Sequence, residues 1–327
     1  MAATDELTPT ARGRELVRGA YDMHVHIAPD TVERIIDDVG LARRCQELGL
    51  AGFQLKSHYT STAERAAVVR GVVPGIEVFG AVTLNRAVGG MNPLAVEIAA
   101  REGARTVWLP TVDSLNEMTG AHELAPGAKP PVWMRLQREL REQGVEIEPV
   151  RVVDEDGALL AETDAVLDAV ARHGMVLATG HLSRDEIFAV VEAAAEKGIE
   201  TIVVTHPEFP AQDIGVEDQA RLADRGALLE RCFTTPHTGK VSWERVFEAI
   251  RATGPERSVL STDLGQVFNP PVEDGLALMA DRLLAAGFDE EEIHTMAVTN
   301  TRRLAGAPPP SALSPGAEPP GGGTPWA

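Results

Sequence analysis

The chain has 327 residues, with 49 acidic against 30 basic side chains and 44% apolar residues. This length is sufficient to bury one large core or two modest cores. The net charge of −19 argues against capture of nucleic acid or anionic lipid, because both require a basic surface. We therefore expect a small-molecule substrate, no nucleic acid and no membrane as partners, while the sequence leaves homo-oligomer formation open.

The two cysteines and the start of the chain predict the compartment. Cys45 and Cys232 lie far apart without a CxxC motif, so neither a disulfide framework nor a cysteine zinc site is expected. No apolar run approaches the roughly 20 residues of a membrane span, and Met1 to Arg14 lacks the apolar region of a signal peptide. These features predict a cytoplasmic protein.

Short β-rich runs alternate with stretches of helical spacing, which is typical of βα units and a parallel sheet. The predicted strands are residues 21–27, 52–57, 77–84, 105–112, 175–180, 200–205, 227–233 and 258–262. The main predicted helices are residues 37–48, 63–70, 93–102, 163–173, 184–197, 216–223, 243–252 and 272–286. Eight such units over about 250 residues predict an α/β fold, the (β/α)8 TIM barrel.

The interval between the fourth and fifth predicted strands is longer than one βα unit requires. The extra residues, 113–162, contain a predicted helix at 132–142 and a predicted β-hairpin over 147–161. Because this insertion follows a barrel strand, it lies on the face where strands end. It is therefore either a lid over a pocket or a surface elaboration.

The two ends of the chain differ in composition from the barrel. Residues 306–327 are rich in proline and glycine and are predicted to be disordered, and residues 1–13 are predicted to be flexible. We therefore expect one barrel domain over residues 14–305.

Metal-competent side chains occur where predicted strands end. His24 and His26 lie two apart near the end of the first strand, so both imidazoles can face one side and bind one cation. His181, His206 and Asp263 each directly follow a later predicted strand. Because all strand ends of a barrel meet at one rim, these side chains are predicted to form one metal site. The alternative is that the later residues only cap strands or begin a helix.

A histidine-rich set with one carboxylate favours a transition ion over magnesium or calcium. Zinc is the first candidate, manganese and iron are alternatives, and one or two ions are expected. Such an ion lowers the pKa of water toward about 7. Asp263 is the predicted general base, and His206 is either a metal ligand or the residue that polarises the substrate.

This pattern resembles the amidohydrolase superfamily, whose barrels carry a His-x-His on the first strand, histidines after strands five and six, and an aspartate after strand eight. The resemblance covers residues 20–305 and includes Asp22-Met23-His24-Val25-His26 and the ending Asn300-Thr301-Arg302-Arg303-Leu304. The segment Ser261-Thr262-Asp263-Leu264-Gly265-Gln266 looks like an uncharacterised branch of the superfamily. The resemblance implies hydrolysis of an amide, ester or lactone by metal-activated water.

The fourth strand departs from that family, in which two-metal members often place a carboxylated lysine or a glutamate there. Residues 106–111 contain neither, and Asp113 lies beyond them. A lysine follows the second strand instead, where Lys56 and His58 share one side. Lys56 is a predicted catalytic residue. It would bridge two ions as a carbamate, bind an anionic group of the substrate, or stabilise negative charge that develops during the reaction. The alternative is that Lys56 reaches solvent at the rim of the barrel.

Three further residues are predicted to bind substrate. Asn85 and Arg86 end the third strand and would hold a substrate carbonyl or carboxylate, unless they form a plain turn. His58 belongs either to the site or to a surface loop. Glu230 lies in an apolar run and needs a partner, for which Lys56 or Arg231 would serve.

The leading functional hypothesis is a metal-dependent hydrolase of a small molecule with a carbonyl centre. A one-metal non-oxidative decarboxylase is an alternative that the missing strand-four bridge mildly favours. A phosphoesterase usually requires two or three ions and cationic groups around the phosphate. A metal-binding regulator without catalysis would saturate its ion with protein ligands.

Overall fold

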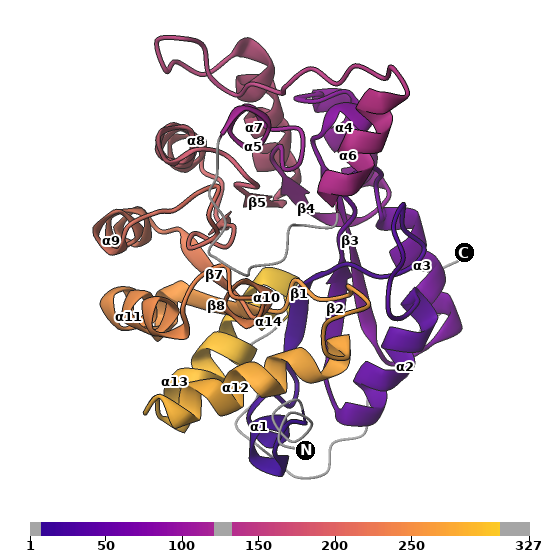
Figure 1. Cartoon of the computed structure of the whole chain (residues 1–327), viewed down its shortest axis with the longest axis vertical. Coiled ribbons are helices and arrows are strands. Elements are labelled where there is room, and N and C mark those ends of the chain that lie inside the picture. The colour runs from indigo at the N-terminus through magenta and orange to yellow at the C-terminus, as the bar shows by residue number, and fades with distance from the viewer. Residues whose placement is uncertain (1–7, 121–132, 308–327) are drawn as a thin grey trace.

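The computed structural model describes residues 8–120 and 133–307. In these ranges eight parallel strands pair in sequence order, which confirms the predicted TIM barrel (Figure 1). The strands are β1 Tyr21–Val25, β2 Gly52–Leu55, β3 Glu77–Thr83, β4 Ala104–Trp108, β5 Val176–Ala178, β6 Ile202–Val204, β7 Leu228–Cys232 and β8 Ser258–Ser261. The barrel closes between β1 and the segment after β8, where the His26 amide donates to the Leu264 carbonyl at 2.8 Å.

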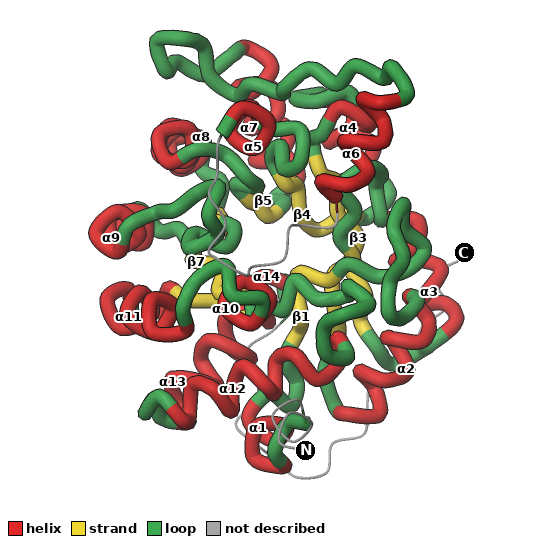
Figure 2. The backbone as a smooth tube through the Cα atoms, viewed as in Figure 1, coloured by secondary structure: helices red, strands yellow, loops and turns green. Residues whose placement is uncertain are grey.

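Helices surround the barrel on its outer side (Figure 2). The longer ones are α2 Asp38–Leu48, α3 Ala63–Val72, α4 Pro93–Arg101, α7 Ala161–His173, α8 Arg184–Glu196, α9 Val216–Asp224, α11 Trp243–Thr253 and α12 Gly275–Ala285. Capping residues explain several helix boundaries. Ser183 and Glu186 form a capping box at the start of α8, and Gly174 ends α7 in a left-handed conformation. Within the described ranges, no helix has both the length and the apolar character to cross a bilayer.

A short helix covers the amino ends of the strands and packs against an apolar cluster inside the barrel. Tyr21, Met23 and Trp108 belong to one buried cluster with Leu304 of α14 (Asn300–Ala305). The Asn300 side chain donates to the backbone carbonyls of Pro255 and Ser258 at 2.8 and 2.7 Å. The Asn-x-x-x-Leu ending therefore fastens the last helix to the end of the barrel opposite the carboxyl ends of the strands.

The insertion is only partly as predicted. The helix expected at 132–142 is α6 Trp133–Glu142, and a further helix, α5 Leu115–Thr119, precedes it. The predicted hairpin is reduced to a single antiparallel bridge between Val153 and Leu159, because α7 already begins at Ala161. Residues 121–132 of the insertion lie outside the described residues.

The remaining helices lie near the ends of the domain or follow the barrel strands. They are α1 Ala11–Leu16, α10 Thr234–His237 and α13 Glu290–His294. Helix α1 begins inside the segment predicted to be flexible, with Thr10 accepting a hydrogen bond from the Gly13 amide. Residues 1–7 and 308–327, which carry most of the predicted flexible and disordered ends, also lie outside the described residues.

Candidate metal centre and active site

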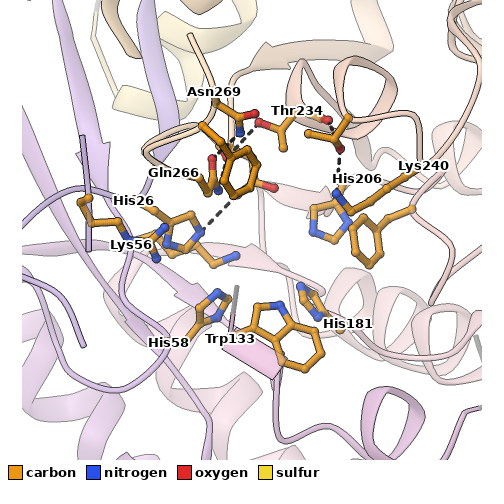
Figure 3. A pocket seen from close by; sticks show the side chains of 15 residues that line it. His26, Lys56, His58, Trp133, His181, His206, Thr234, Lys240, Gln266 and Asn269 are labelled. Atoms are coloured by element: carbon orange, nitrogen blue, oxygen red, sulfur yellow. Dashed lines mark hydrogen bonds and ion pairs between the residues drawn. The ribbon is translucent and has the colours of Figure 1, made fainter. Parts of the chain in front are cut away.

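A pocket lies at the carboxyl ends of the strands. The side chains that line it come from the segments after β1, β2, β4, β5, β6, β7 and β8 (Figure 3). Those that were predicted as site residues are His26, Lys56, His58, His181, His206 and Asp263. The position of the pocket matches the face on which TIM-barrel enzymes carry their sites.

His24 is the centre of the predicted ligand group and is fully buried. Its Nε2 lies 3.3 Å from Asp263 Oδ1, and His26 Nε2 lies 3.2 Å from the same oxygen. One donor atom from each of these three residues lies within 4.8 Å of the other two. A single ion could lie between these donor atoms once Lys56 Nζ, which is 2.9 Å from His24 Nε2, moves away from that nitrogen.

The two later histidines adjoin this group. The ring of His206 lies 6.1 Å from the ring of His24, and the ring of His181 lies 5.0 Å from that of His206, measured between centroids. The structure thus brings all five predicted metal residues to one place, although their roles as ligands stay predictions.

Burial keeps the imidazoles of His26, His58 and His206 neutral. It lowers the pKa of His206 to about 3, with a further contribution from nearby His181, and it lowers the pKa values of His26 and His58 well below the usual range. The Nδ1 atoms of His26 and His206 have no hydrogen-bond partner among the described residues. Buried polar atoms without partners are costly, and neutral imidazoles are the form that binds metal. The donor set therefore fits a divalent transition ion.

The backbone at two of these residues is unusual. His206 has φ of 26° and Asp263 has φ of 52°, both in the left-handed region that residues other than glycine rarely adopt. Such strain costs of the order of 1–3 kcal/mol and is found most often at functional sites. Burial by itself raises the pKa of Asp263, but nearby His24 and Lys56 outweigh it and lower this pKa below its usual value. The strained segment therefore presents an ionised carboxylate to the pocket.

Glu230 supports His24 from within the barrel. Its Oε1 lies 3.0 Å from His24 Nδ1 and accepts a hydrogen bond from the Ser261 hydroxyl at 2.8 Å. Burial raises the pKa of Glu230, but the contact with His24 outweighs it and the pKa falls to about 2. Because an ionised carboxylate only accepts hydrogen bonds, His24 Nδ1 is the donor, which leaves Nε2 as the atom able to bind a metal.

The partners predicted for Glu230 need correction. Arg231 does not pair with it, because its guanidinium contacts Glu208 and Gln219 instead. Neighbouring residues on a strand point to opposite faces, so the two side chains cannot share one environment. Lys56 acts on Glu230 only through its charge.

A second possible ligand group lies on the same side as Glu230. Donor atoms of His24, Glu230 and Cys232 lie within 4.8 Å of one another. Burial raises the pKa of the Cys232 thiol well above its usual range, and metal binding requires the thiolate. The group that includes Asp263 is therefore the better metal site.

We expect Glu230→Gln to weaken metal binding by about 10- to 100-fold while the fold is kept, because carboxylates behind ligating histidines have effects of this size. The measurement is metal affinity by competition with a chelator. Glu208→Gln is a matched control, because Glu208 is also buried but pairs with Arg231. Equal metal affinity of the Glu230→Gln protein and the wild type would contradict this role.

Lys56 and His58 are placed inside the site. Lys56 is 3% exposed, so the alternative of a solvent-reaching lysine is wrong. Its Nζ lies 2.9 Å from His24 Nε2 and 5.0 Å from the ring centroid of Trp108. The ring of His58 stacks on that of His26 at 4.8 Å, so His58 does not belong to a surface loop.

Asn85 and Arg86 do not line the pocket, contrary to the expectation that they bind substrate. The Asn85 amide nitrogen donates to the His58 carbonyl and to Thr111 Oγ1, at 2.9 and 2.7 Å. The Arg86 guanidinium donates to the carbonyls of Glu148 and Pro149. Asn85 therefore positions the loop that carries His58, and Arg86 fastens the insertion.

Several site residues were not predicted from the sequence. Trp133, at the start of α6, has its ring 6.4 Å from that of His181, and Glu117 of α5 lies 3.0 Å from His181 Nδ1. Phe209 lies 4.9 Å from His206 between ring centroids. Phe209 follows the end of β6 closely, so the rule that barrel strands end at one rim could have indicated it. No sequence pattern in the insertion indicated Trp133 or Glu117. The insertion therefore contributes to the wall of the pocket.

Solved structures share this fold at low sequence identity. An amidohydrolase from Pseudomonas aeruginosa has a TM-score of 0.59 and 13% identity, with 89% of this chain and 97% of that chain covered. A putative 2-pyrone-4,6-dicarboxylic acid hydrolase from Pseudomonas putida has a TM-score of 0.53 and 16% identity, with 88% of this chain and 97% of that chain covered. A third structure is a metallopeptidase from Rhodobacter sphaeroides, liganded with a phosphinate mimic of the dipeptide L-Ala-D-Ala. It has a TM-score of 0.55 and 13% identity, with 88% of this chain and 98% of that chain covered.

These similarities confirm the predicted resemblance at the level of the fold, which is amidohydrolase-like. No curated protein matches the sequence. The profile of DUF6282, a family of unknown function, matches residues 19–230, and the chain therefore belongs to this family.

Proposed function

We propose that the protein is a metal-dependent hydrolase that cleaves an amide, ester or lactone of a small molecule with activated water. The observation that carries the proposal is the group of His24, His26 and Asp263, whose donor atoms lie within 4.8 Å of one another at the carboxyl ends of the strands. The names of the three similar structures, an amidohydrolase, a dicarboxylic acid hydrolase and a metallopeptidase, agree with hydrolysis.

These three residues would hold the ion, with His181 and His206 next to it. Nitrogen donors with one carboxylate favour zinc, and manganese or iron is the alternative. Such an ion, when bound, lowers the pKa of water toward about 7 and polarises a carbonyl group. In this proposal, the Asp22-x-His-x-His motif places two of the metal ligands, His24 and His26, at the carboxyl end of β1.

Asp263 is the proposed base. Its carboxylate takes a proton from the attacking water, whose oxygen bonds to the substrate carbonyl carbon. The bond from that carbon to nitrogen or oxygen then breaks, and Asp263 passes the proton to the leaving group. The ammonium form of Lys56 stabilises the negative charge that develops on the carbonyl oxygen.

The test uses the purified protein, stripped of metal with a chelator and reloaded with zinc, manganese or iron. A panel of amides, esters, lactones, carboxylic acids and phosphoesters is then screened for released acid, amine, alcohol, carbon dioxide and phosphate. We expect turnover that requires the ion and yields an acid with an amine or alcohol. Release of carbon dioxide would establish the decarboxylase instead, and release of phosphate a phosphoesterase. Tight metal binding without turnover of any compound would favour the regulator.

Replacing Lys56 distinguishes its proposed roles. We expect Lys56→Ala to lower kcat by about 100- to 1000-fold, the effect of removing one group that stabilises developing charge. Metal content by elemental analysis should not change, because the three ligands remain. A fall from two ions to one would instead identify a carbamate bridge. Lys197→Ala is the control, because Lys197 pairs with Asp164 and Asp168 away from the pocket.

A further inference from the structure

We infer that the substrate carries a carboxylate, which is held in the pocket by Lys240 with help from Arg34. This inference rests on the proposed function, because it concerns what the same pocket binds. It also names a substrate class, which neither the family nor the fold provides.

Three cationic side chains line the pocket of a chain that is acidic overall. Arg34, Lys56 and Lys240 line it, and Asp263 is the acid among the lining residues. The chain as a whole has a net charge of −19. Cationic side chains that line a pocket attract small anions to it. A divalent ion at the metal centre would strengthen this attraction.

Arg34 has an unused donor. Its side chain is 3% exposed, and two of its nitrogens, Nη2 and Nε, contact Asp30 Oδ2 at 2.7 and 2.8 Å. The third, Nη1, is buried and has no hydrogen-bond partner in the part of the chain that the structure describes. A buried guanidinium nitrogen without a partner is costly, and an acceptor on a bound ligand would satisfy it.

Lys240 provides the second cation. It lies in the segment after α10 and is partly buried, and its Nζ donates to Thr238 Oγ1 at 2.7 Å. The same Nζ lies 5.9 Å from the ring centroid of Phe209. Figure 3 shows Lys240 and His26 on opposite sides of the pocket. The lysine can therefore hold one end of a substrate whose reacting carbonyl lies at the metal centre.

The remaining polar side chains decide between a carboxylate and a phosphate. Gln266 Nε2 donates to the Asp263 carbonyl at 3.0 Å, and Asn269 Nδ2 donates to Gln266 Oε1 at 2.7 Å. The Thr234 hydroxyl donates to the Thr262 carbonyl at 2.8 Å. One N–H of each amide remains free among the described residues, but with Lys56 at the metal centre the cations left for the ligand are Lys240 and one nitrogen of Arg34. These two match a two-oxygen monoanion better than a dianionic phosphate, which needs more charged donors.

The walls of the pocket are apolar on several sides. Trp133, Phe209 and Phe268 line it together with the cations. Aromatic side chains pack against flat or apolar groups, whereas the cations bind the charged end. The substrate class is therefore a small amide, ester or lactone with an apolar body and a free carboxylate.

The experiment measures binding rather than turnover. The probes are benzoate, benzamide and phenyl phosphate, titrated calorimetrically into the zinc-loaded full-length protein and its variants, with zinc content checked for each. We expect benzoate to bind the wild type, and its Kd to rise about tenfold in Lys240→Gln, the size of one lost charge-assisted hydrogen bond. Lys240→Arg should restore most of the affinity, and benzamide binding should change less than twofold between variants.

Equal benzoate affinity in the wild type and the Lys240→Gln protein would overturn the inference. The inference would also be overturned if phenyl phosphate bound more tightly than benzoate and its affinity fell in Lys240→Gln, because the ligand of the pocket would then be a phosphate. Arg34→Gln is a second, independent variant and should also weaken benzoate. Because no turnover is measured, a failure of hydrolysis in the substrate panel and a failure of this inference are distinguishable.

Discussion

Asp263→Asn is expected to lower kcat by about 100- to 10,000-fold, which is the contribution of a positioned general base. The asparagine amide cannot accept a proton at neutral pH, although its oxygen can still bind a metal. His24 and His26 remain in place, so we expect at least part of the metal to be retained. Elemental analysis and kcat on a substrate from the panel measure the two effects separately.

Asp213→Asn is a matched control for the backbone at this position. Asp213 also has a left-handed conformation, with φ of 42°, but it pairs with Arg245 and does not line the pocket. Its replacement should change neither metal content nor kcat. Full activity of the Asp263→Asn protein would exclude Asp263 as the base.

Gly265→Ala is expected to reduce activity by at least about 100-fold, because a displacement of about 1 Å at a catalytic group has this effect. Gly265 has φ of 132°, and a Cβ atom added there would lie 1.5 Å from the His26 carbonyl oxygen. The segment after β8 would have to move away from β1, which breaks the contact that closes the barrel. Asp263 would then separate from His26, and metal affinity should fall together with kcat.

Gly198→Ala controls for the cost of backbone conformation. Gly198 has φ of 74°, but a Cβ atom added there would meet no atom within 4 Å. We expect it to lower the free energy of unfolding by about 1 kcal/mol, the cost of a left-handed alanine, without any change in metal binding. Urea denaturation and chelator competition test both variants. If both behave alike, the close approach of Gly265 to His26 has no role in the site.

The barrel and the meeting of the five predicted metal residues were accessible from the sequence for a common reason. Strand and helix periodicity is a local property, and each barrel strand ends at the same rim. His24 and Asp263 are far apart in the chain, yet the rule for strand ends places them together. Glu230 of β7 was misassigned because its partner, His24 of β1, comes near it only through the closure of the barrel between β1 and the segment after β8.

The sequence by itself determined the alternation of strands and helices, the positions of the strand ends and the chemistry of the donors. Only the tertiary structure decided which rim residues face the pocket. Asn85 and Arg86 turn toward backbone carbonyls, whereas Arg34, Trp133 and Lys240 line the pocket. The physical reason is that loop side chains have no repeating direction. Their orientation is set by contacts with segments distant in the chain, which no local pattern encodes.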